Sequence, residues 1–364
     1  YPARLHLTDF IPGGGGDHPL ESPAWTKHLP LEEITIAEAL RPAGYVSGHF
    51  GKWHLNSTKD YRPGQPMDPA SQGFDAVLTT VKPKSTDDPE SDPHHVQQIT
   101  DAAIGFIEAH RQRPFFCYVS HNSVHRPVIA RPEVASELGQ HIASNAQQAS
   151  AKYAAMVNEL DESVGRIMQT LDALDLSNET LLIFTSDNGG FMGDAKDDGT
   201  SNAPLRAGKG TNFEGGVRVP TIVRLPGVTA AGSVCHELII SNDFFATFAE
   251  IAKLPENSSN ETDGVSIAPL LENSVAHLDR EALFWHYPHY HSMGATPHGA
   301  VRVGPWKLIE FYEDMHSELY NLEEDLGEQN DLAAEMPEKT NELRQRLHNW
   351  REEVGAQMPV PAGS

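Results

Sequence analysis

The sequence is poor in cysteine, in basic residues and in long apolar runs, and each shortage excludes a class of protein. Only Cys117 and Cys235 occur, too few for a disulfide framework. The 27 basic and 51 acidic side chains give a formal net charge of -24, which argues against a nucleic-acid surface. No run approaches the roughly 18 apolar residues that span a bilayer, and the first residues have no signal-peptide character. We therefore expect a soluble protein in which any anionic substrate meets a locally basic pocket.

Helical and strand-like segments alternate through most of the sequence. The expected helix and strand pairs are Leu31 to Leu40 with Tyr45 to Phe50, Val96 to His110 with Pro114 to Ser120, and Lys152 to Leu174 with Leu181 to Thr185. A further strand from Leu238 to Ile240 and a helix from Phe244 to Ala252 follow. This alternation predicts an α/β fold with a largely parallel sheet that helices cover on both faces. Cys117 lies within one of the apolar runs, so we expect a buried, inert thiol.

The pattern changes after about residue 276. Short strands joined by turns are expected at Gly299 to Arg302, Trp306 to Phe311 and Glu318 to Leu322, with a closing helix from about Pro337. In that helix Leu343, Leu347 and Trp350 lie at helical spacing and would pack on the sheet. We therefore expect a large domain over residues 1–276 and a small domain, an antiparallel sheet with a helix, over residues 277–364.

One polar motif, Ser186-Asp187-Asn188-Gly189-Gly190, directly follows an apolar strand. In open α/β sheets, ligands bind beyond the carboxyl ends of the strands. Asp187 and Asn188 offer two hard oxygen ligands, which suit Ca²⁺ or Mg²⁺. An Asx-turn with glycines at the bend is an equally good interpretation of this motif alone.

Two further motifs place cations near strand ends. Gly51-Lys52-Trp53-His54 holds an ammonium and an imidazole two residues apart, able to clamp an anionic oxygen and to pass a proton. A surface lysine beside a half-buried histidine has the same pattern. The segment from Ser120 to Pro127 carries His121 and His125 where a strand opens into a loop. A helix cap or a turn would use the same residues.

A glycine-rich stretch from Gly208 to Pro220 lacks the spacing of a phosphate-cradling or dinucleotide-binding loop, so nucleotide binding is not expected. Lys209 is the candidate anion ligand of this stretch. Glu214 and Arg218 fit a structural ion pair with one another as well as they fit a ligand role.

These motifs, in this order, resemble the arylsulfatase-like sulfatases. The motifs that carry the resemblance are Gly44-Tyr45, Gly51-Lys52-Trp53-His54-Leu55, His125-Arg126-Pro127, Thr185-Ser186-Asp187-Asn188-Gly189, Gly208-Lys209-Gly210 and Glu214-Gly215-Gly216-Val217-Arg218-Val219-Pro220. The likeness extends to the tail through Ala300-Val301-Arg302, Trp306-Lys307-Leu308-Ile309 and Glu318-Leu319-Tyr320-Asn321-Leu322. It therefore covers essentially the whole chain.

The resemblance implies an alkaline-phosphatase-like fold and the hydrolysis of sulfate esters at a Ca²⁺ site. In that family an Asp-Asn pair helps to hold the metal, and the matching pair here is Asp187 and Asn188. The residues that match the sulfate-gripping and proton-donating groups are Lys52, His54, His125 and Lys209. Several fixed cations suit the spread negative charge of the transition state. A periplasmic or extracellular location is implied in the same way.

Two functional elements of that family have no match in this sequence. The nucleophile comes from a Cys/Ser-x-Pro/Ala-x-Arg motif whose first residue is oxidised to formylglycine, and no such motif occurs. Nor does an Asp-Asp metal pair follow an apolar strand, since Asp87-Asp88 and Asp197-Asp198 both have polar surroundings. We therefore expect a sulfatase framework without its N-terminal strand and nucleophile. Impaired catalysis, weak or absent Ca²⁺ binding and a tendency to self-associate would follow.

The stretch from Trp285 to His291 is dense in imidazole and aromatic rings, and it resembles the substrate-facing loop of sulfatases that act on carbohydrates. The candidate substrate ligands are His121, His286, His289, His291 and His298. Aromatic packing between two domains fits the same composition equally well. The expected partner is a sulfated small molecule or glycan, with neither nucleic acid nor membrane.

Three other functions are compatible with these motifs. A phosphatase or phosphonate-ester hydrolase of the same superfamily would share the metal pair. A non-catalytic sulfoglycan-binding protein would keep the lysines and histidines without turnover. An esterase using a serine with one of the histidines is a third alternative, but the Gly-x-Ser-x-Gly motif of such enzymes is absent.

Overall fold

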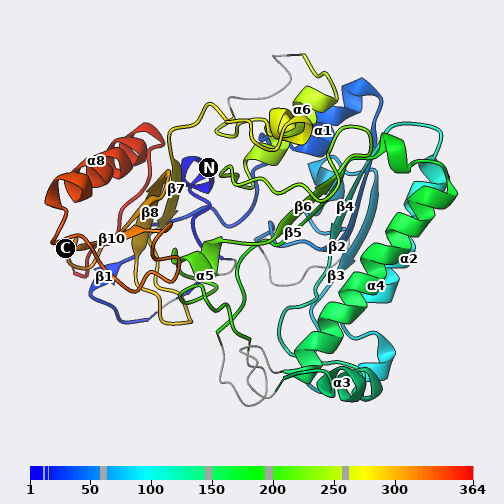
Figure 1. The fold of residues 1–364 in the computed structure, drawn as a ribbon, viewed down its shortest axis with the longest axis horizontal. Helices are drawn as coiled ribbons and strands as arrows, with labels where there is room; N and C mark the ends of the chain where they lie inside the picture. Colours follow the sequence, from blue (N-terminus) through cyan, green and yellow to red (C-terminus); the bar gives the residue numbers. More distant parts are fainter. Residues whose placement is uncertain are drawn as a thin grey trace.

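The computed structural model describes residues 1–10, 13–14, 16–57, 64–143, 150–192, 200–255 and 262–363. A parallel sheet covered by helices lies at one end of the molecule, and an antiparallel sheet with one long helix lies at the other (Figure 1). Irregular segments join the two ends through the middle of the molecule. The expected α/β fold with a smaller antiparallel sheet is therefore confirmed.

Three strands, β2 (Val46–Lys52), β3 (Ala76–Thr80) and β4 (Phe115–Ser120), form the parallel sheet in the order β3-β2-β4. Both outer strands run in the same direction as β2. Lys52 pairs with Thr80 of β3, and Gly51 pairs with Ser120 of β4. All three strands therefore end at one edge of the sheet.

Helices cover both faces of this sheet. The helices of this half are α1 (Ile36–Leu40), α2 (Val96–His110), α3 (Pro132–Gly139), α4 (Ala151–Ala173), α6 (Asp243–Ile251) and α7 (Ala268–Glu272). Because side chains alternate along a strand, Phe115 and Cys117 of β4 join the apolar cluster of α2 and α4, whereas Phe116 packs with Ala37 of α1. Burial raises the pKa of the Cys117 thiol to about 12, which keeps it protonated at neutral pH.

An antiparallel pair of strands, β5 (Leu182–Thr185) and β6 (Thr221–Arg224), lies beside the parallel sheet (Figure 1). The prediction of a strand from Leu238 to Ile240 is wrong, because these residues form no strand. The backbone N–H of Ile240 donates instead to the Asp243 carboxylate (2.8 Å), so this segment leads into α6 rather than pairing in a sheet. The four residues of β6 are too few to show a strand pattern in the sequence.

The antiparallel sheet has the order β10-β9-β8-β7. Its strands are β7 (Leu283–Tyr287), β8 (His298–Val303), β9 (Trp306–Phe311) and β10 (Ser317–Asn321). Leu343 and Leu347 of α8 (Pro337–Glu353) pack on Leu319 of the sheet. The aromatic stretch expected as a loop from Trp285 instead pairs with β8 as far as Tyr287. The loop therefore begins only after that residue.

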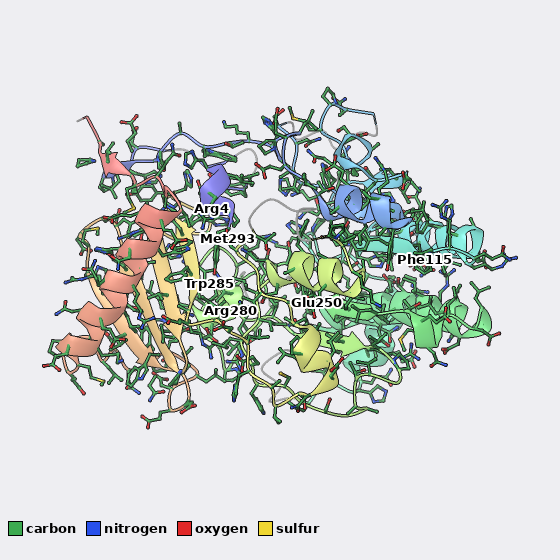
Figure 2. All side chains as sticks on the ribbon, turned by 90° about the horizontal axis from the view of Figure 1, so that it is seen from above. Arg4, Phe115, Glu250, Arg280, Trp285 and Met293 are labelled. Atoms are coloured by element: carbon green, nitrogen blue, oxygen red, sulfur yellow. The ribbon has the colours of Figure 1, made fainter. Side chains whose placement is uncertain are left out.

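Residues near the start of the chain belong to the core of this C-terminal half. Ala3 is buried in one apolar cluster with residues of β8, β9 and α8, and the Tyr1 ring lies edge-on to Trp350 at 5.1 Å. β1 (Leu20–Glu21) pairs with β11 (Val360–Pro361) in an antiparallel arrangement. Figure 2 shows Arg280 between Trp285 of the sheet and Glu250 of α6, and its guanidinium pairs with Asp243 of α6 at 2.8 Å. This ion pair joins the two halves.

Short elements complete the described ranges. They are α5 (Glu214–Val217) and the 3-10 helices η1 (Pro2–Leu5), η2 (Arg41–Ala43), η3 (Ala70–Gln72), η4 (Pro89–Ser91) and η5 (Ser177–Glu179). None of the helices in the described ranges has the length and apolarity needed to cross a membrane.

Candidate active site

Hydrogen bonds from Ser120 and Asn122, at and just after the end of β4, connect the carboxyl ends of the three parallel strands. Ser120 Oγ donates to the carbonyl oxygen of Lys52 (2.7 Å), and Asn122 Nδ2 donates to Thr80 Oγ1 (2.7 Å). Lys52 itself is the last residue of β2. These bonds fix the ends of β2, β3 and β4 relative to one another, so groups placed there keep a defined geometry.

Lys52 and His54 flank a buried anchor. Trp53 lies between them in sequence with 6% of its surface exposed, and its Nε1 donates to the carbonyl oxygen of Met67 (2.9 Å). The Trp53 ring packs with Ala37 of α1 and Phe74. Burial of this indole therefore fixes the backbone on which Lys52 and the half-buried His54 are carried.

The Asp187-Asn188 motif extends from the end of β5 and touches the glycine-rich loop directly. Lys209 N donates to Gly190 O (3.0 Å), and Gly189 N donates to Gly216 O (2.9 Å). Asn202 Oδ1 accepts from Gly190 N (3.0 Å), and its Nδ2 donates to Gly190 O (2.9 Å). A Cβ at Gly189 would collide with the carbonyl oxygen of Gly215. The glycines of both motifs thus permit a close backbone crossing.

Three lysines, one histidine and one carboxylate influence one another at this edge. The pKa of Lys52 is below its usual value because the ammonium is buried and because Lys209 and Lys82 are near, while Asp187 acts in the opposite direction. Burial lowers the pKa of His125 to about 4, and Lys209, Lys52 and Lys82 add to that shift. Electrostatic interactions therefore link Lys52 and His125 with charged residues from three other segments.

Lys82 was not expected from the sequence. It follows β3, much as Lys52 ends β2, and β3 pairs alongside β2. The apolar run of β3 is short and ends in two threonines, so the sequence does not mark it clearly as a strand. Recognising β3 would have indicated a lysine just beyond its carboxyl end.

The matched metal motif offers two side chains with oxygen donors, Asp187 and Asn188. The Asn188 amide nitrogen donates to Gly189 O (2.9 Å), so its side-chain oxygen is the atom that would coordinate a cation, beside the Asp187 carboxylate. Asp87 and Asp88 serve a local turn instead, accepting from Lys84 N (2.8 Å) and Glu90 N (3.0 Å). Asp197-Asp198 lies outside the described residues. Among the described residues, no three His, Cys, Asp or Glu side chains are grouped to hold a metal.

Two of the candidate substrate histidines have both ring nitrogens engaged. His286 Nδ1 bonds to Tyr312 OH (2.8 Å), and its Nε2 bonds to Gln357 O (2.9 Å). His298 Nε2 accepts from Asn212 N (3.0 Å), and its Nδ1 donates to Thr296 O (2.6 Å). Burial lowers the pKa of both rings to about 4. This geometry favours packing over direct contact with a sugar for these two residues.

The other three histidines differ in what they face. His121 Nε2 bonds to the hydroxyl of Ser163 in α4 (3.0 Å), and His289 Nε2 bonds to the hydroxyl of Thr8 (2.8 Å). His291 lies against Gly210, where a Cβ would come within 2.6 Å of its Nδ1. Burial lowers the pKa of His291 and Lys209 lowers it further, whereas the Asp9 carboxylate raises it. Of these histidines, His291 is the one that the structure brings next to the lysine site.

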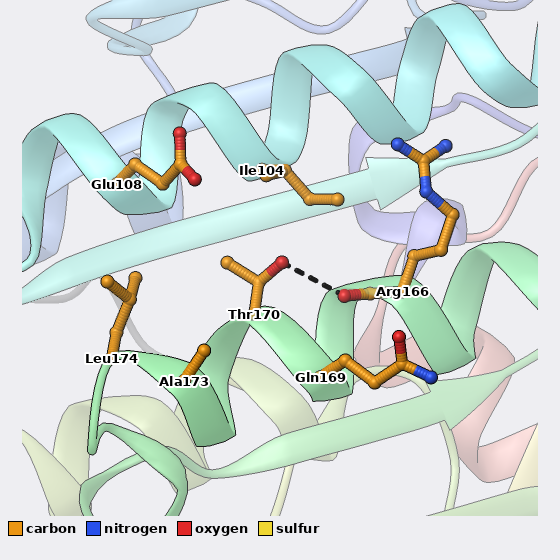
Figure 3. Close-up of a pocket in the computed structure, with 7 residues that line it drawn as sticks. All are labelled: Ile104, Glu108, Arg166, Gln169, Thr170, Ala173 and Leu174. Atoms are coloured by element: carbon orange, nitrogen blue, oxygen red, sulfur yellow. Dashed lines mark hydrogen bonds between the residues drawn. The ribbon is translucent and has the colours of Figure 1, made fainter.

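A groove of about 350 Å³ lies between α2 and α4. Figure 3 shows Glu108 and Leu174 at one end of it and Arg166 at the other, with Thr170 bonded to the Arg166 carbonyl oxygen (3.0 Å). Its walls come from the C-terminal halves of both helices. Each helix leads back to the start of the next strand, so the groove lies at the amino edge of the sheet, opposite Lys52. It is no part of the lysine site.

Lys52, Lys209 and His125 form a basic group at the carboxyl edge of an α/β sheet. Comparison with known families assigns the class of protein. The Sulfatase family matches residues 11–254, and the family described as N-sulphoglucosamine sulphohydrolase, C-terminal, matches residues 208–354. The chain belongs to the sulfatase family.

Curated relatives support this membership. A protein named sulfatase from Formosa agariphila is 36% identical over 310 residues, which are 78% of this chain and 55% of the relative. The N-acetylgalactosamine-6-sulfatase of Mus musculus is 31% identical over 310 residues, 79% of this chain and 57% of the relative. The chain thus spans little more than half the length of these relatives.

Solved structures share the fold. One described as Ps i-CgsB in complex with k-i-k-neocarrahexaose superposes with a TM-score of 0.74 at 23% identity, covering 96% of this chain and 79% of that chain. The phosphonate monoester hydrolase of Agrobacterium radiobacter superposes with a TM-score of 0.66 at 21% identity, covering 93% of this chain and 86% of that chain. At such identities the likeness shows the fold alone.

Proposed function

We propose that this chain is a sulfuric ester hydrolase framework whose lysine site binds the sulfate group of a sulfated carbohydrate. The observation that carries the proposal is the convergence of Lys52, Lys82, His125 and Lys209 beside Asp187. Cations placed together are stabilised by a bound anion, so the arrangement is complementary to the singly charged sulfate group of a sulfate ester. The names of the curated relatives, which include an N-acetylgalactosamine-6-sulfatase, support a sugar sulfate as the substrate class.

Each cation has a distinct role in this proposal. In it, Lys52 and Lys209 bind the sulfate oxygens, and Lys82 adds positive charge nearby. His125 Nδ1 donates to Arg126 O (2.7 Å), so Nε2 is the nitrogen left to exchange a proton. The negative charge of bound sulfate would raise the pKa of His125 from about 4, so the ring could then deliver a proton to the leaving alcohol. His54 is a second candidate for that proton transfer, carried on the same rigid segment as Lys52.

Ca²⁺ binding by this chain is proposed to be weak. Asp187 and Asn188 supply one carboxylate and one amide oxygen, whereas Ca²⁺ takes about 6–8 oxygen ligands. When bound, such a cation would withdraw charge from the sulfate oxygens. Titration calorimetry with Ca²⁺ would contradict this proposal if it showed tight stoichiometric binding to the chain.

Turnover by these 364 residues is proposed to be slow. The sequence holds no Cys/Ser-x-Pro/Ala-x-Arg motif, and none of the clustered lysines and histidines offers the two-hydroxyl nucleophile of a formylglycine hydrate. Loss of a nucleophile lowers a hydrolytic rate by on the order of 10⁶-fold. The chain is therefore expected to bind sulfate measurably while hydrolysing sulfate esters little or not at all.

The test uses two assays on the same preparations. Titration calorimetry with inorganic sulfate measures binding, and steady-state assays with an aryl sulfate and a sulfated galactose oligosaccharide measure turnover. Lys209→Ala should weaken sulfate binding about tenfold or more, since a charge-assisted hydrogen bond is lost. The matched control is Lys152→Ala, which removes an exposed lysine from the first turn of α4 and should leave binding unchanged.

The two parts of the proposal can fail separately. If Lys209→Ala binds sulfate with unchanged affinity, the proposal that Lys209 belongs to an anion site is wrong. Robust turnover that Lys209→Ala abolishes would keep the anion site but contradict impaired catalysis. Saturable binding of a sulfated oligosaccharide without turnover would also fit a non-catalytic sulfoglycan-binding protein, the alternative closest to this proposal.

A phosphatase or phosphonate-ester hydrolase is the second candidate function. The observation that favours it is the shared fold with a phosphonate monoester hydrolase. Phosphate and phosphonate monoesters are tetrahedral anions that the same lysines would bind. Comparison of an aryl sulfate with an aryl phosphate, both in binding and in turnover, separates the two functions.

Secretion to the periplasm or outside the cell is proposed from family membership, and fractionation of expressing cells tests it.

A further inference from the structure

The loop that carries Lys209 is fastened to the antiparallel sheet of the C-terminal half. Asn212 N donates to His298 Nε2 (3.0 Å) at the start of β8. Arg206 donates to the Tyr320 hydroxyl (2.7 Å) and to the carbonyl oxygen of Glu328 (2.9 Å). The Arg206 guanidinium also lies over the Phe213 ring at 3.9 Å. The loop from residue 206 to residue 213 is thus held on both sides of Lys209.

A buried ion cluster of Lys307, Glu214 and Glu328 completes this attachment. Lys307 Nζ lies 2.8 Å from Glu214 Oε1 and 3.0 Å from Glu328 Oε1. The backbone N–H of Glu214 donates to Glu328 Oε2 (2.7 Å). The three side chains are 0%, 1% and 0% exposed in that order. A lysine of β9 therefore joins the first residue of α5 to the segment that follows β10.

The balance of charge in this cluster depends on Lys307. Burial would raise the pKa of Glu214, but Lys307 and Arg302 bring it below its usual value, with help from Arg218. Burial raises the pKa of Glu328, although Lys307 opposes that shift. Without Lys307, two carboxylates would be buried side by side with too little positive charge. Buried ion groups seldom add net stability compared with apolar packing, and a role in fixing geometry is one explanation for them.

The path from the cluster to the lysine site is short and rigid. Gly215 N donates to Arg206 O (2.9 Å), and Gly216 O accepts from Gly189 N (2.9 Å). A Cβ on Gly215 or Gly216 would collide with backbone oxygens of the loop. Displacement of α5 would therefore move both the Lys209 loop and the segment after Asp187, since neither has room to adjust independently.

We propose that Lys307 is a positioning residue for the sulfate site, acting through Glu214 and Glu328 on the loop that holds Lys209. The inference rests on the proposed function, because it assumes that Lys209 binds the sulfate group. It assigns the C-terminal sheet a part in anion binding, although no side chain of that sheet needs to touch the anion.

The test is a double-mutant cycle on the full chain, with inorganic sulfate as the probe and titration calorimetry as the readout. Lys307→Met should weaken sulfate binding about tenfold, since small displacements of a binding group have effects of this size or larger. In a Lys209→Ala background, Lys307→Met should have no further effect, because its influence passes through Lys209. Glu328→Gln, which keeps hydrogen-bonding atoms at the same place, should show a smaller loss in the same direction.

Glu310→Gln is the matched control. Glu310 lies three residues after Lys307 on β9, is 0% exposed, and pairs with His348 (2.7 Å) and Arg351 (3.3 Å) of α8 rather than with the loop. This variant should lower the melting temperature as Lys307→Met does, yet keep the sulfate affinity of the unaltered chain. A purely structural role for Lys307 predicts that Lys307→Met and Glu310→Gln change the sulfate affinity equally.

The outcomes separate the inference from the function on which it rests. If Lys209→Ala loses sulfate affinity while Lys307→Met and Glu328→Gln keep it, the positioning role is wrong and the anion site stands. If Lys307→Met fails to fold, the same comparison is made with Glu328→Gln alone and in the Lys209→Ala background. If the unaltered chain binds no sulfate, or Lys209→Ala binds it unchanged, both the proposed function and this inference are overturned.

Discussion

At position 51, backbone conformation and close packing both require glycine. The φ angle of Gly51 is +122°, which residues with a Cβ rarely adopt, and a Cβ there would collide with the Ser120 carbonyl oxygen. This glycine lets β2 lie against β4 immediately before Lys52. We predict that Gly51→Ala lowers the free energy of unfolding by about 2 kcal/mol or more, as measured by urea denaturation.

A glycine without either constraint provides the control. Gly105 lies in the middle of α2, is exposed, and would have no heavy atom within 4 Å of an added Cβ. Gly105→Ala should raise the free energy of unfolding by about 0.5–1 kcal/mol, because alanine is the better helix former. Equal effects in the two variants would show that the conformation at position 51 is not strained for alanine.

The charge of Lys209 should be detectable in the titration of two histidines. Lys209 lowers the pKa of both His125 and His291, in each case after burial as the larger cause. Removal of a nearby positive charge favours the protonated ring. We predict that Lys209→Ala raises the pKa of both histidines, as followed by NMR titration. His286, whose pKa is lowered by burial and by other neighbours, should not change, and a shift of all three rings would indicate a general structural change.

At the scale of single elements, the long helices and most strands, including the four-residue β5, could be predicted from the sequence, but β3 and β6 could not. α2 begins and ends at the residues expected, Val96 and His110, because many apolar residues at helical spacing define it. The apolar runs of β3 and β6 are shorter than the run of four apolar residues from Leu181 to Phe184 that marks β5, so their strand character depends on neighbours in the sheet.

Candidate site residues could be proposed from the sequence where a motif coincides with a strand end, and not elsewhere. Lys52, His125 and Lys209 follow or end recognisable segments, and the structure brings them together. The buried cluster around Lys307 could not be predicted, because Lys307 and Glu328 are 93 and 114 residues away from Glu214 in sequence and meet it only when the sheet packs on α5. Local sequence contains no signal for such a contact.

α1 shows how a cap sets the start of an element. The helix was expected from Leu31, but it begins at Ile36, because Thr35 caps it: the Thr35 hydroxyl accepts from Glu38 N (3.3 Å), and Glu38 Oε2 accepts from Thr35 N (2.9 Å). We predict that Thr35→Ala lowers the free energy of unfolding by about 1 kcal/mol, measured in urea. Thr35→Ser, which keeps the hydroxyl, should lose much less, and an equal loss would assign the effect to the missing methyl group.

At the scale of the whole molecule, buried histidines make stability depend on pH. Burial lowers the pKa of five rings to about 4, and these are His49, His121, His125, His286 and His298. The unfolded chain takes up protons at these positions below about pH 6.5, whereas the folded chain does so only near pH 4. The stability due to the neutral rings is therefore complete above pH 6.5 and is lost as the pH falls toward 4.

We predict that the free energy of unfolding falls steadily over this range, by up to about 3 kcal/mol for a fully buried ring such as His298. Lys307 and His291 also lower the pKa of His298. Urea denaturation at several pH values measures the slope. His298→Gln should reduce it by about 1.4 kcal/mol per pH unit, whereas His277→Gln, at a ring that is 89% exposed, should leave it unchanged. Identical slopes in all three proteins would contradict the assignment.

The shared core of Ala3 with α8 has a consequence for how the protein is made. Ala3 packs in the same cluster as Leu347, which is translated more than 340 residues later. At about 5–20 residues per second, roughly 20 to 70 s pass between the two. During that interval the stretch around Ala3 has no native surface on which to pack. Its apolar residues are then exposed to chaperones and to other nascent chains. Final assembly of this half therefore waits until α8 has been synthesised and has left the ribosome.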